Sequence, residues 1–174
     1  MDAGSTLMPA TPLQLFSLFD QLGIQHNTID HPPMFTVEDG RDWHDKIPGL
    51  HCKNLFIKDK KGGIWLVVMP GDKRADLNRL EKQLGAPRFS FGKPDLLLEV
   101  LGVTPGSVTP YALINDKDKR VTVVLDDEML RSDTVNFHPL HNAASTTMTS
   151  VDLVKFIEHL GYKPIIKDCG PEVF

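Results

Sequence analysis

Residues 53–69, KNLFIKDKKGGIWLVVM, are the stretch that decides the fold. Two apolar runs, KNLFIKD at 53–59 and IWLVVM at 64–69, flank the polar segment KKGG at 60–63. Glycine adopts the positive backbone angles of a tight turn at no steric cost, so this pattern predicts a β-hairpin. The second run carries no polar residue and is therefore predicted to be a central strand, buried on both faces.

The clearest helix is predicted near the N-terminus. Thr11 has the residue type of an N-cap, Pro12 suits the first helical position, and Gln14 can reach back to the Thr11 amide. Apolar residues follow at helical spacing from Leu15, and Gly23 is the expected stop. Further helices are predicted to begin at Thr36, to span 75–84 and 94–101, and to follow a cap at Ser150.

Short strands are predicted throughout the rest of the chain. They cover residues 24–30, 88–91, 134–137 and 146–149, with a second hairpin formed by 112–115 and 121–125. Helices interrupt hairpins instead of alternating with strands, which favours an α+β fold with a largely antiparallel or mixed sheet. With 174 residues, the sequence predicts one domain over 11–174, preceded by a flexible tail at 1–10.

Composition narrows the classes of function. The formal net charge is −4, from 19 Lys and Arg against 23 Asp and Glu, so a protein that coats nucleic acid through a broad basic face is disfavoured. Cys52 and Cys169 fit neither a disulfide framework nor a zinc spacing, which favours a reducing, cytoplasmic location. No apolar run approaches the roughly 20 residues that cross a bilayer, so no membrane partner is expected.

Several catalytic signatures are absent from the sequence. It contains no GxxxxGK[ST], no GxGxxG, no HExxH and no GxSxG. Nucleotide-driven, dinucleotide-dependent and serine-hydrolase chemistry are therefore disfavoured. His138 and His141 leave a metal-dependent hydrolase as a rival hypothesis, although Pro139 between them prevents a helical pair from being assumed. We predict no metal and no cofactor.

Three features have residue types that suit ester chemistry. Lys53 opens the first strand of the hairpin, as a solvent-reaching edge residue or as a cation aimed at a phosphate or a developing negative charge. The loop GSVTP at 106–110 is a connector or a source of backbone N–H groups for an ester carbonyl. His138 is a half-buried histidine or a pocket wall. Taken singly, each feature leaves both interpretations open.

Together these segments resemble the bacterial YbaK and prolyl-tRNA-synthetase-associated editing-domain family, whose freestanding members include deacylases of alanyl-tRNA(Pro). The resemblance runs in a consistent order from about residue 11 to residue 164. Its motifs are HPPMFT at 31–36, KNLFIKDK at 53–60, RFSFG at 88–92, GVTPGSVTP at 102–110, ALIND at 112–116, VTVVLD at 121–126 and NFHPL at 136–140.

The resemblance implies a curved, largely antiparallel sheet flanked by helices and hydrolysis of the ester between a mischarged amino acid and the tRNA 3′ end. It places Lys53, Asn54 and a GxxxP loop in the active site, and it makes His138 a determinant of the accepted amino acid. The catalytic residues expected on this basis are Lys53, Asn54, Gly106, Ser107 and Pro110. The expected substrate-binding residues are Phe35, Thr36, Val108, Thr109, Asn136 and His138, and the expected tRNA contacts are Lys58, Lys60 and Lys61.

Pocket energetics make alanine the expected substrate residue. A site large enough for proline cannot exclude a smaller alanine by clash, and one missing methylene is worth only about 1–3 kcal/mol, so a second sieve is needed. The expected partner is the 3′ acceptor end of mischarged tRNA(Pro), with a transient association with prolyl-tRNA synthetase as a further possibility. The alternatives are a non-catalytic module that binds aminoacyl-tRNA or an amino acid, and a family deacylase that prefers cysteine or serine.

Overall fold

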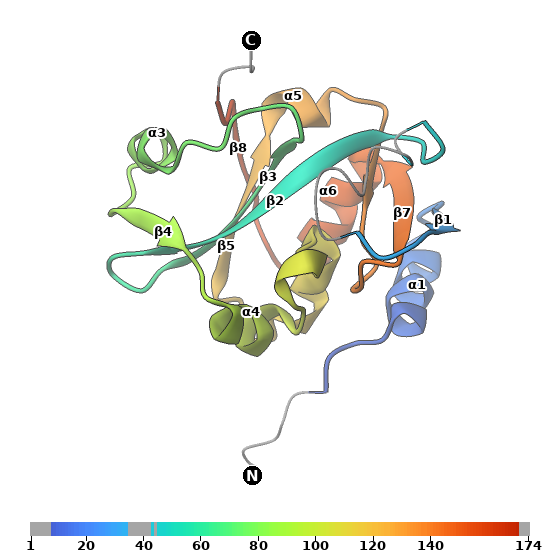
Figure 1. Ribbon diagram of the computed structural model, residues 1–174. Coiled ribbons are helices and arrows are strands. Elements are labelled where there is room, and N and C mark those ends of the chain that lie inside the picture. Colours follow the sequence, from blue (N-terminus) through green and yellow to red (C-terminus); the bar gives the residue numbers. More distant parts are fainter. Residues whose placement is uncertain (1–7, 35–42, 44, 171–174) are drawn as a thin grey trace.

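The all-apolar run of the sequence forms strand β3 (Ile64–Pro70), which lies between β2 (Leu50–Asp59) and β5 (Val121–Asp126). The computed structural model describes residues 8–34, 43 and 45–170. β2 and β3 pair antiparallel as the predicted hairpin, whereas β3 and β5 pair parallel (Figure 1). The predictions of a hairpin and of a central strand are therefore confirmed.

The complete sheet is mixed. Its order is β1-β7-β6-β2-β3-β5-β8, with β4 added to β2. Within the described residues four strand pairings are antiparallel and three, β2–β6, β3–β5 and β5–β8, are parallel. The remaining strands are β1 (Asn27–Asp30), β4 (Phe89–Phe91), β6 (Thr134–Phe137), β7 (Ala144–Thr149) and β8 (Ile165–Lys167).

Strand β2 has two different neighbours along its outer edge. Leu50 and His51 pair with β6, and residues 57–59 pair with β4. Between them, residues 52–56 have a strand partner only on the β3 side, among the residues that the structure describes. Residues 52–54 of this unpaired edge line the cavity described below.

Helices cover both faces of the sheet because its central strands alternate apolar side chains between two cores. Leu66 and Val68 belong to the larger core, and Val67 and Met69 to the smaller one. The larger core is covered by α1 (Pro12–Gln21), α4 (Pro94–Leu101), α6 (Ser150–His159) and the 3₁₀ helix η2 (Pro110–Asn115). The smaller core is covered by α3 (Leu77–Gln83), and the short α5 (Asp127–Leu130) follows β5 (Figure 1).

Of the predicted N-caps, the structure confirms that of α1. Thr11 and Gln14 form the predicted capping box of α1. For α6 the prediction was wrong by one residue: the Thr149 side chain accepts from the Asp152 amide at 3.1 Å, and Ser150 is the first helical residue. The Ser150 hydroxyl instead donates to the Ser132 carbonyl at 2.6 Å. The helix predicted to begin at Thr36 falls outside the described residues.

The predicted strand at 112–115 is wrong, because residues 110–115 form the 3₁₀ helix η2. Thr109 caps this helix by accepting from the Tyr111 amide at 3.2 Å, and Pro110 occupies its first position. Asp116 then accepts from the amides of Arg120 and Val121 and turns the chain into β5. The segment is therefore a crossover into a parallel strand and not one arm of a hairpin.

None of the helices in the described part of the chain is long and apolar enough to span a bilayer.

We expect Asp59→Ala to lower the free energy of unfolding by about 2 kcal/mol, because it leaves three partly buried donors without their acceptor. The Asp59 carboxylate accepts from the amides of Lys61 and Gly63, each at 2.9 Å, and from Trp65 Nε1 at 3.0 Å. Burial alone would raise the pKa of Asp59, but these hydrogen bonds outweigh burial and lower it.

The stabilisation by Asp59 is thus present above the ordinary aspartate pKa and is lost as the pH falls through the lowered value. Urea unfolding at pH 7 and in acid measures it. The matched control is Asp118→Ala, at an exposed turn position, which should change stability by less than about 0.5 kcal/mol. Equal stability losses in the two variants would contradict this role for Asp59.

Candidate functional site

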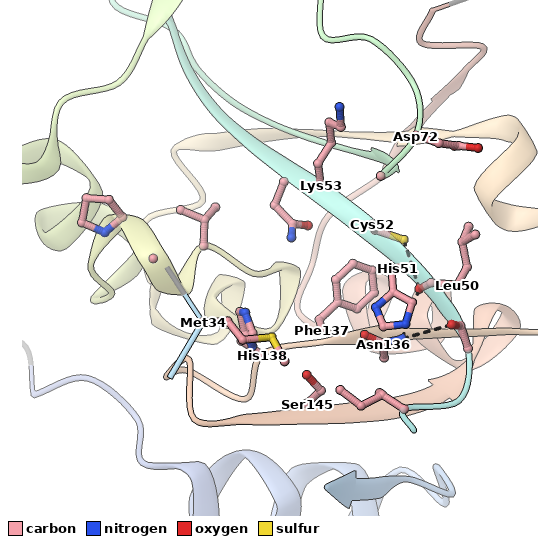
Figure 2. Close-up of a pocket in the computed structure, with 17 residues that line it drawn as sticks. Met34, Leu50, His51, Cys52, Lys53, Asp72, Asn136, Phe137, His138 and Ser145 are labelled. Atoms are coloured by element: carbon pink, nitrogen blue, oxygen red, sulfur yellow. Dashed lines mark hydrogen bonds between the residues drawn. The ribbon is translucent and has the colours of Figure 1, made fainter. Parts of the chain in front are cut away.

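A cavity of about 690 Å³ opens beside residues 52–54 of β2. Its wall combines the first half of β2, the loop before η2, the end of β6 and the start of β7 (Figure 2). The described residues that line it are Met34, Ile47, Gly49, Leu50, His51, Cys52, Lys53, Asn54, Gly71, Asp72, Pro105, Gly106, Val108, Asn136, Phe137, His138 and Ser145.

Lys53 and Asn54 are adjacent in β2 and therefore point to opposite faces of the sheet. Figure 2 shows Lys53 and Asp72 on one side of β2, with Met34, His138 and Ser145 on the other. The Lys53 ammonium donates to the Lys73 carbonyl. Burial lowers the pKa of Lys53, and the charge of Asp72 partly offsets that effect. Lys53 thus supplies positive charge at one end of the cavity.

Asn54 brings an unsatisfied polar atom to the cavity wall. Its side-chain oxygen Oδ1 is buried and has no hydrogen-bond partner among the described residues. Leaving such an acceptor unpaired costs about 1–3 kcal/mol, so a buried group of this kind calls for a functional explanation. A donor on a bound ligand, or a water in the cavity, would satisfy it.

The GxxxP loop is only partly at the cavity. Gly106 and Val108 line it, together with Pro105. Pro105–Ser107 form a 3₁₀ turn, η1, in which the Ser107 amide donates to the Thr104 carbonyl at 2.9 Å. The Gly106 amide comes earlier in this turn, where helical amides lack an acceptor within the turn. Because Gly106 lines the cavity, its amide is the candidate donor to a ligand there.

The other predicted residues of this loop are buried and hold the loop in place. Ser107 and Pro110 are buried and do not line the cavity. Thr109 is fully buried, and its hydroxyl caps η2. The sequence motif therefore contains two residues at the cavity and three that hold the loop in place.

The end of β6 forms the opposite wall. The Asn136 side-chain amide donates to the carbonyls of Pro48 and Gly49, at 3.1 and 3.2 Å, and so fixes the entry into β2. His138 Nδ1 lies 2.9 Å from the Ala144 carbonyl and must donate to it, because a carbonyl only accepts. Burial lowers the pKa of His138, so the neutral ring presents Nε2 to the cavity as an acceptor.

The turn after His138 is locally strained. Leu140 has φ of 74°, which a leucine rarely adopts, and its amide donates to the His138 carbonyl at 3.0 Å. Backbone strain of this kind persists where the surrounding structure enforces it, and it is common at binding sites. The His138-Pro139-Leu140 turn is thus held in one conformation beside the cavity.

Several wall residues were not predicted from the sequence. Met34 is anchored by Asn142, whose side chain donates to the Met34 carbonyl at 3.1 Å. Burial raises the pKa of Cys52 to about 12, so this thiol is protonated at neutral pH and is not a nucleophile. Ser145 lies on the cavity floor and is bonded to His31. The predicted residues Phe35 and Thr36 lie outside the described part of the chain.

The hairpin lysines do not reach the cavity. Lys58, near the far end of β2, and Lys60 and Lys61, in the turn after it, are exposed. At about 3.3 Å per strand residue, Lys58 lies roughly 16 Å along the strand from Lys53. Within the described residues, no group of three or more His, Cys, Asp or Glu side chains is placed to hold a metal ion.

The aminoacyl-tRNA editing domain model matches residues 31–156. The chain belongs to this family. Every described residue of the cavity wall falls inside the matched segment. The fold is therefore that of an editing domain, and the cavity lies within the matched segment.

Named relatives extend the family assignment. The chain is 37% identical over 155 residues to the prolyl-tRNA synthetase associated domain-containing protein 1 of Danio rerio, covering 88% of this chain and 84% of that protein. It is 33% identical over 143 residues to the prolyl-tRNA editing protein ProX of Acetoanaerobium sticklandii, covering 82% and 87%. A crystal structure described as a candidate trans-editing enzyme for prolyl tRNA synthetase superimposes with a TM-score of 0.68 at 18% identity, covering 91% of this chain and 98% of that one. This likeness confirms the fold.

Proposed function

We propose that this editing domain hydrolyses the ester between a wrongly attached amino acid, alanine above all, and the 3′ end of tRNA(Pro). The observation that carries the proposal is the convergence of Lys53, Asn54, Gly106 and His138 on one cavity. Its volume, about 690 Å³, lies in the range of small-ligand sites and suits an aminoacylated adenosine. The relative named ProX, a prolyl-tRNA editing protein, supports the choice of tRNA.

The two faces of β2 have different roles in this proposal. On one face the Lys53 ammonium binds the terminal phosphate or the adenosine region of the tRNA. On the other face the Gly106 amide polarises the ester carbonyl as negative charge develops on its oxygen. Asn54 orients the ester, because its buried side chain has hydrogen-bonding capacity that the protein leaves unused. An aminoacyl ester is already activated, so these roles require no metal and no covalent intermediate.

The amino acid side chain enters the apolar part of the cavity, formed by Met34, Val108 and Phe137. Phe137 is held rigidly: its ring packs edge-on against Tyr111 at 5.5 Å, and the Tyr111 hydroxyl donates to the Thr146 carbonyl at 2.9 Å. Close-packed walls of this kind do not expand for a larger residue. The pocket thus admits alanine and excludes proline by size, as the second sieve must.

The rest of the tRNA contacts the protein at few positions. Lys58 of β2 and Lys60 and Lys61 in the turn that follows it are exposed, and they extend the positive charge of Lys53 away from the cavity. The net charge of −4 favours this local contact over a broad one. A cytoplasmic location, and a transient association with prolyl-tRNA synthetase, would place the enzyme beside newly charged tRNA.

A deacylation panel tests the proposed function. tRNA(Pro) charged with alanine, cysteine, serine or proline is incubated with the purified protein, with and without EDTA. We expect alanine to be released at least about 10-fold faster than proline, which is the discrimination that one or two methylenes provide, and EDTA to have no effect. Preference for cysteine or serine would overturn the alanine assignment, loss of activity in EDTA would favour a metal-dependent hydrolase, and binding without turnover would favour a non-catalytic module.

A further inference from the structure

Ser145 and His31 form a hydrogen-bonded chain under the cavity floor. His31 Nδ1 lies 2.8 Å from the Pro32 carbonyl, and His31 Nε2 lies 2.9 Å from Ser145 Oγ. Both side chains are nearly inaccessible, at 7% and 4% exposed, yet Ser145 lines the cavity. These hydrogen bonds therefore connect the cavity to a buried imidazole.

The direction of each hydrogen bond follows from chemistry. A carbonyl oxygen only accepts, so His31 Nδ1 carries the proton and donates to Pro32. In the neutral ring Nε2 is then an acceptor, and the Ser145 hydroxyl donates its proton to it. The Ser145 oxygen keeps lone pairs for a donor in the cavity. This is the arrangement of a hydroxyl, an adjacent base and a third group that orients the base.

We propose that Ser145, backed by His31, accepts the proton of the attacking water during ester hydrolysis. The inference rests on the proposed function and names the group that activates water in that site. Water adds to the ester carbonyl carbon, one of its protons passes to Ser145 Oγ, and the Ser145 proton passes to His31 Nε2. The same path then returns a proton to the departing ribose oxygen, so the enzyme regains its initial protonation state.

The placement of Ser145 favours a proton relay over a nucleophile. A nucleophilic hydroxyl must itself reach the carbonyl carbon, whereas Ser145 lies within strand β7 with 4% of its surface exposed. A water molecule is small enough to occupy the space between this floor and the ester. Ser145 is thus a catalytic residue that contacts the water, and His31 is a positioning residue that acts through it.

His138 lies close to the Ser145–His31 pair but has a different hydrogen-bond partner. Its ring centre is 5.9 Å from that of His31, and its Nδ1 donates to Ala144 and not to Ser145. Removing His138 Nε2 should therefore change the fit of the amino acid without breaking the path from Ser145 to His31.

Single-turnover deacylation of Ala-tRNA(Pro) tests the relay with the variants Ser145→Ala, His31→Gln, their combination and Ser145→Thr. General base catalysis contributes about 10²–10⁴-fold, so we expect each of the first two variants to lower the rate at saturating enzyme by about 100-fold, with the half-saturating concentration changed by less than 3-fold. The double variant should be no slower than the slower single one, because the two residues act as a unit. Ser145→Thr, which keeps the hydroxyl, should retain most of the rate.

Three results would overturn the relay: a rate within 3-fold of wild type in Ser145→Ala, equal losses in Ser145→Thr and Ser145→Ala, or an alanyl-enzyme trapped on Ser145. Thermal unfolding of each variant separates loss of fold from loss of chemistry. Wild-type turnover establishes the proposed function independently, so an active Ser145→Ala variant would reject the relay alone. A wild type without turnover on the whole panel would reject both.

Discussion

Lys53→Ala is expected to lower kcat/KM for Ala-tRNA(Pro) by at least about 100-fold, the usual effect of removing one group that stabilises charge in an active site. Lys53 is the only Lys or Arg among the described residues that line the cavity, so no neighbour replaces its charge. The variant should fold normally, because Lys53 is only partly buried and its ammonium donates, within the described part of the chain, only to the Lys73 carbonyl.

The measurement is steady-state deacylation together with urea unfolding of the same preparation. Lys82→Ala is the matched control, since Lys82 is an exposed lysine on α3 that does not line the cavity, and it should keep activity within 2-fold. Full activity in Lys53→Ala would remove Lys53 from the site. Loss of activity together with loss of stability would make Lys53 a structural residue.

Lys73→Met is expected to lower the free energy of unfolding by about 3–5 kcal/mol, because it leaves a buried carboxylate without its partner. The Lys73 ammonium lies 2.9 Å from both Asp126 and Asp168, and Asp126 is fully buried. Burial disfavours the charged form of Lys73, but the hydrogen bonds to Asp168 and Asp126 outweigh it and raise its pKa. Urea unfolding at pH 7 measures the loss.

Arg131→Met is the matched control for Lys73→Met. Arg131 pairs with Asp127 at 3.7 Å on the surface, where both side chains are more than half exposed, so the change should cost less than about 1 kcal/mol. A comparable loss in the two variants would contradict the assignment of a structural buried network.

The stability difference between wild type and Lys73→Met should depend on pH because of Asp168. The hydrogen bond from Lys73 lowers the pKa of Asp168, so its stabilising contribution is present above the ordinary aspartate pKa and is lost as the pH falls through the lowered value. Lys73→Met removes that contribution. The difference in stability between wild type and variant should therefore narrow as the pH is taken below about 4, near which an unperturbed aspartate titrates.

Local signals in the sequence predicted much of the fold. The capping box at Thr11, the glycine turn before Ile64 and the uninterrupted apolar run of β3 each depend on residues close in the chain, and all three are present. Residues 112–115 were misassigned because a short apolar run has no decisive period, and here Thr109 and Pro110 begin a 3₁₀ helix. Strand β8 was missed, since its three residues pair with β5 only in the folded sheet.

The site was predicted less completely, for a related reason. The KN pair and the histidine of the NFHPL motif line the cavity, as do Gly106 and Val108. Whether a motif residue faces the cavity or the interior depends on the turn that surrounds it, which explains why Ser107 and Thr109 are structural. The bond between Ser145 and His31 joins residues far apart in the chain, and neither residue type alone indicates it.

The parallel pairing of β2 with β6 has a consequence for biosynthesis. His51 pairs with Asn136, eighty-five positions later, and both residues line the cavity. Contacts this distant in sequence close large loops and are associated with slow folding. While the chain is being synthesised, the lysine and asparagine of β2 emerge long before the strand that completes their surroundings. The candidate site is consequently assembled late, and a nascent chain that ends before β7 lacks Ser145 and so part of the cavity wall.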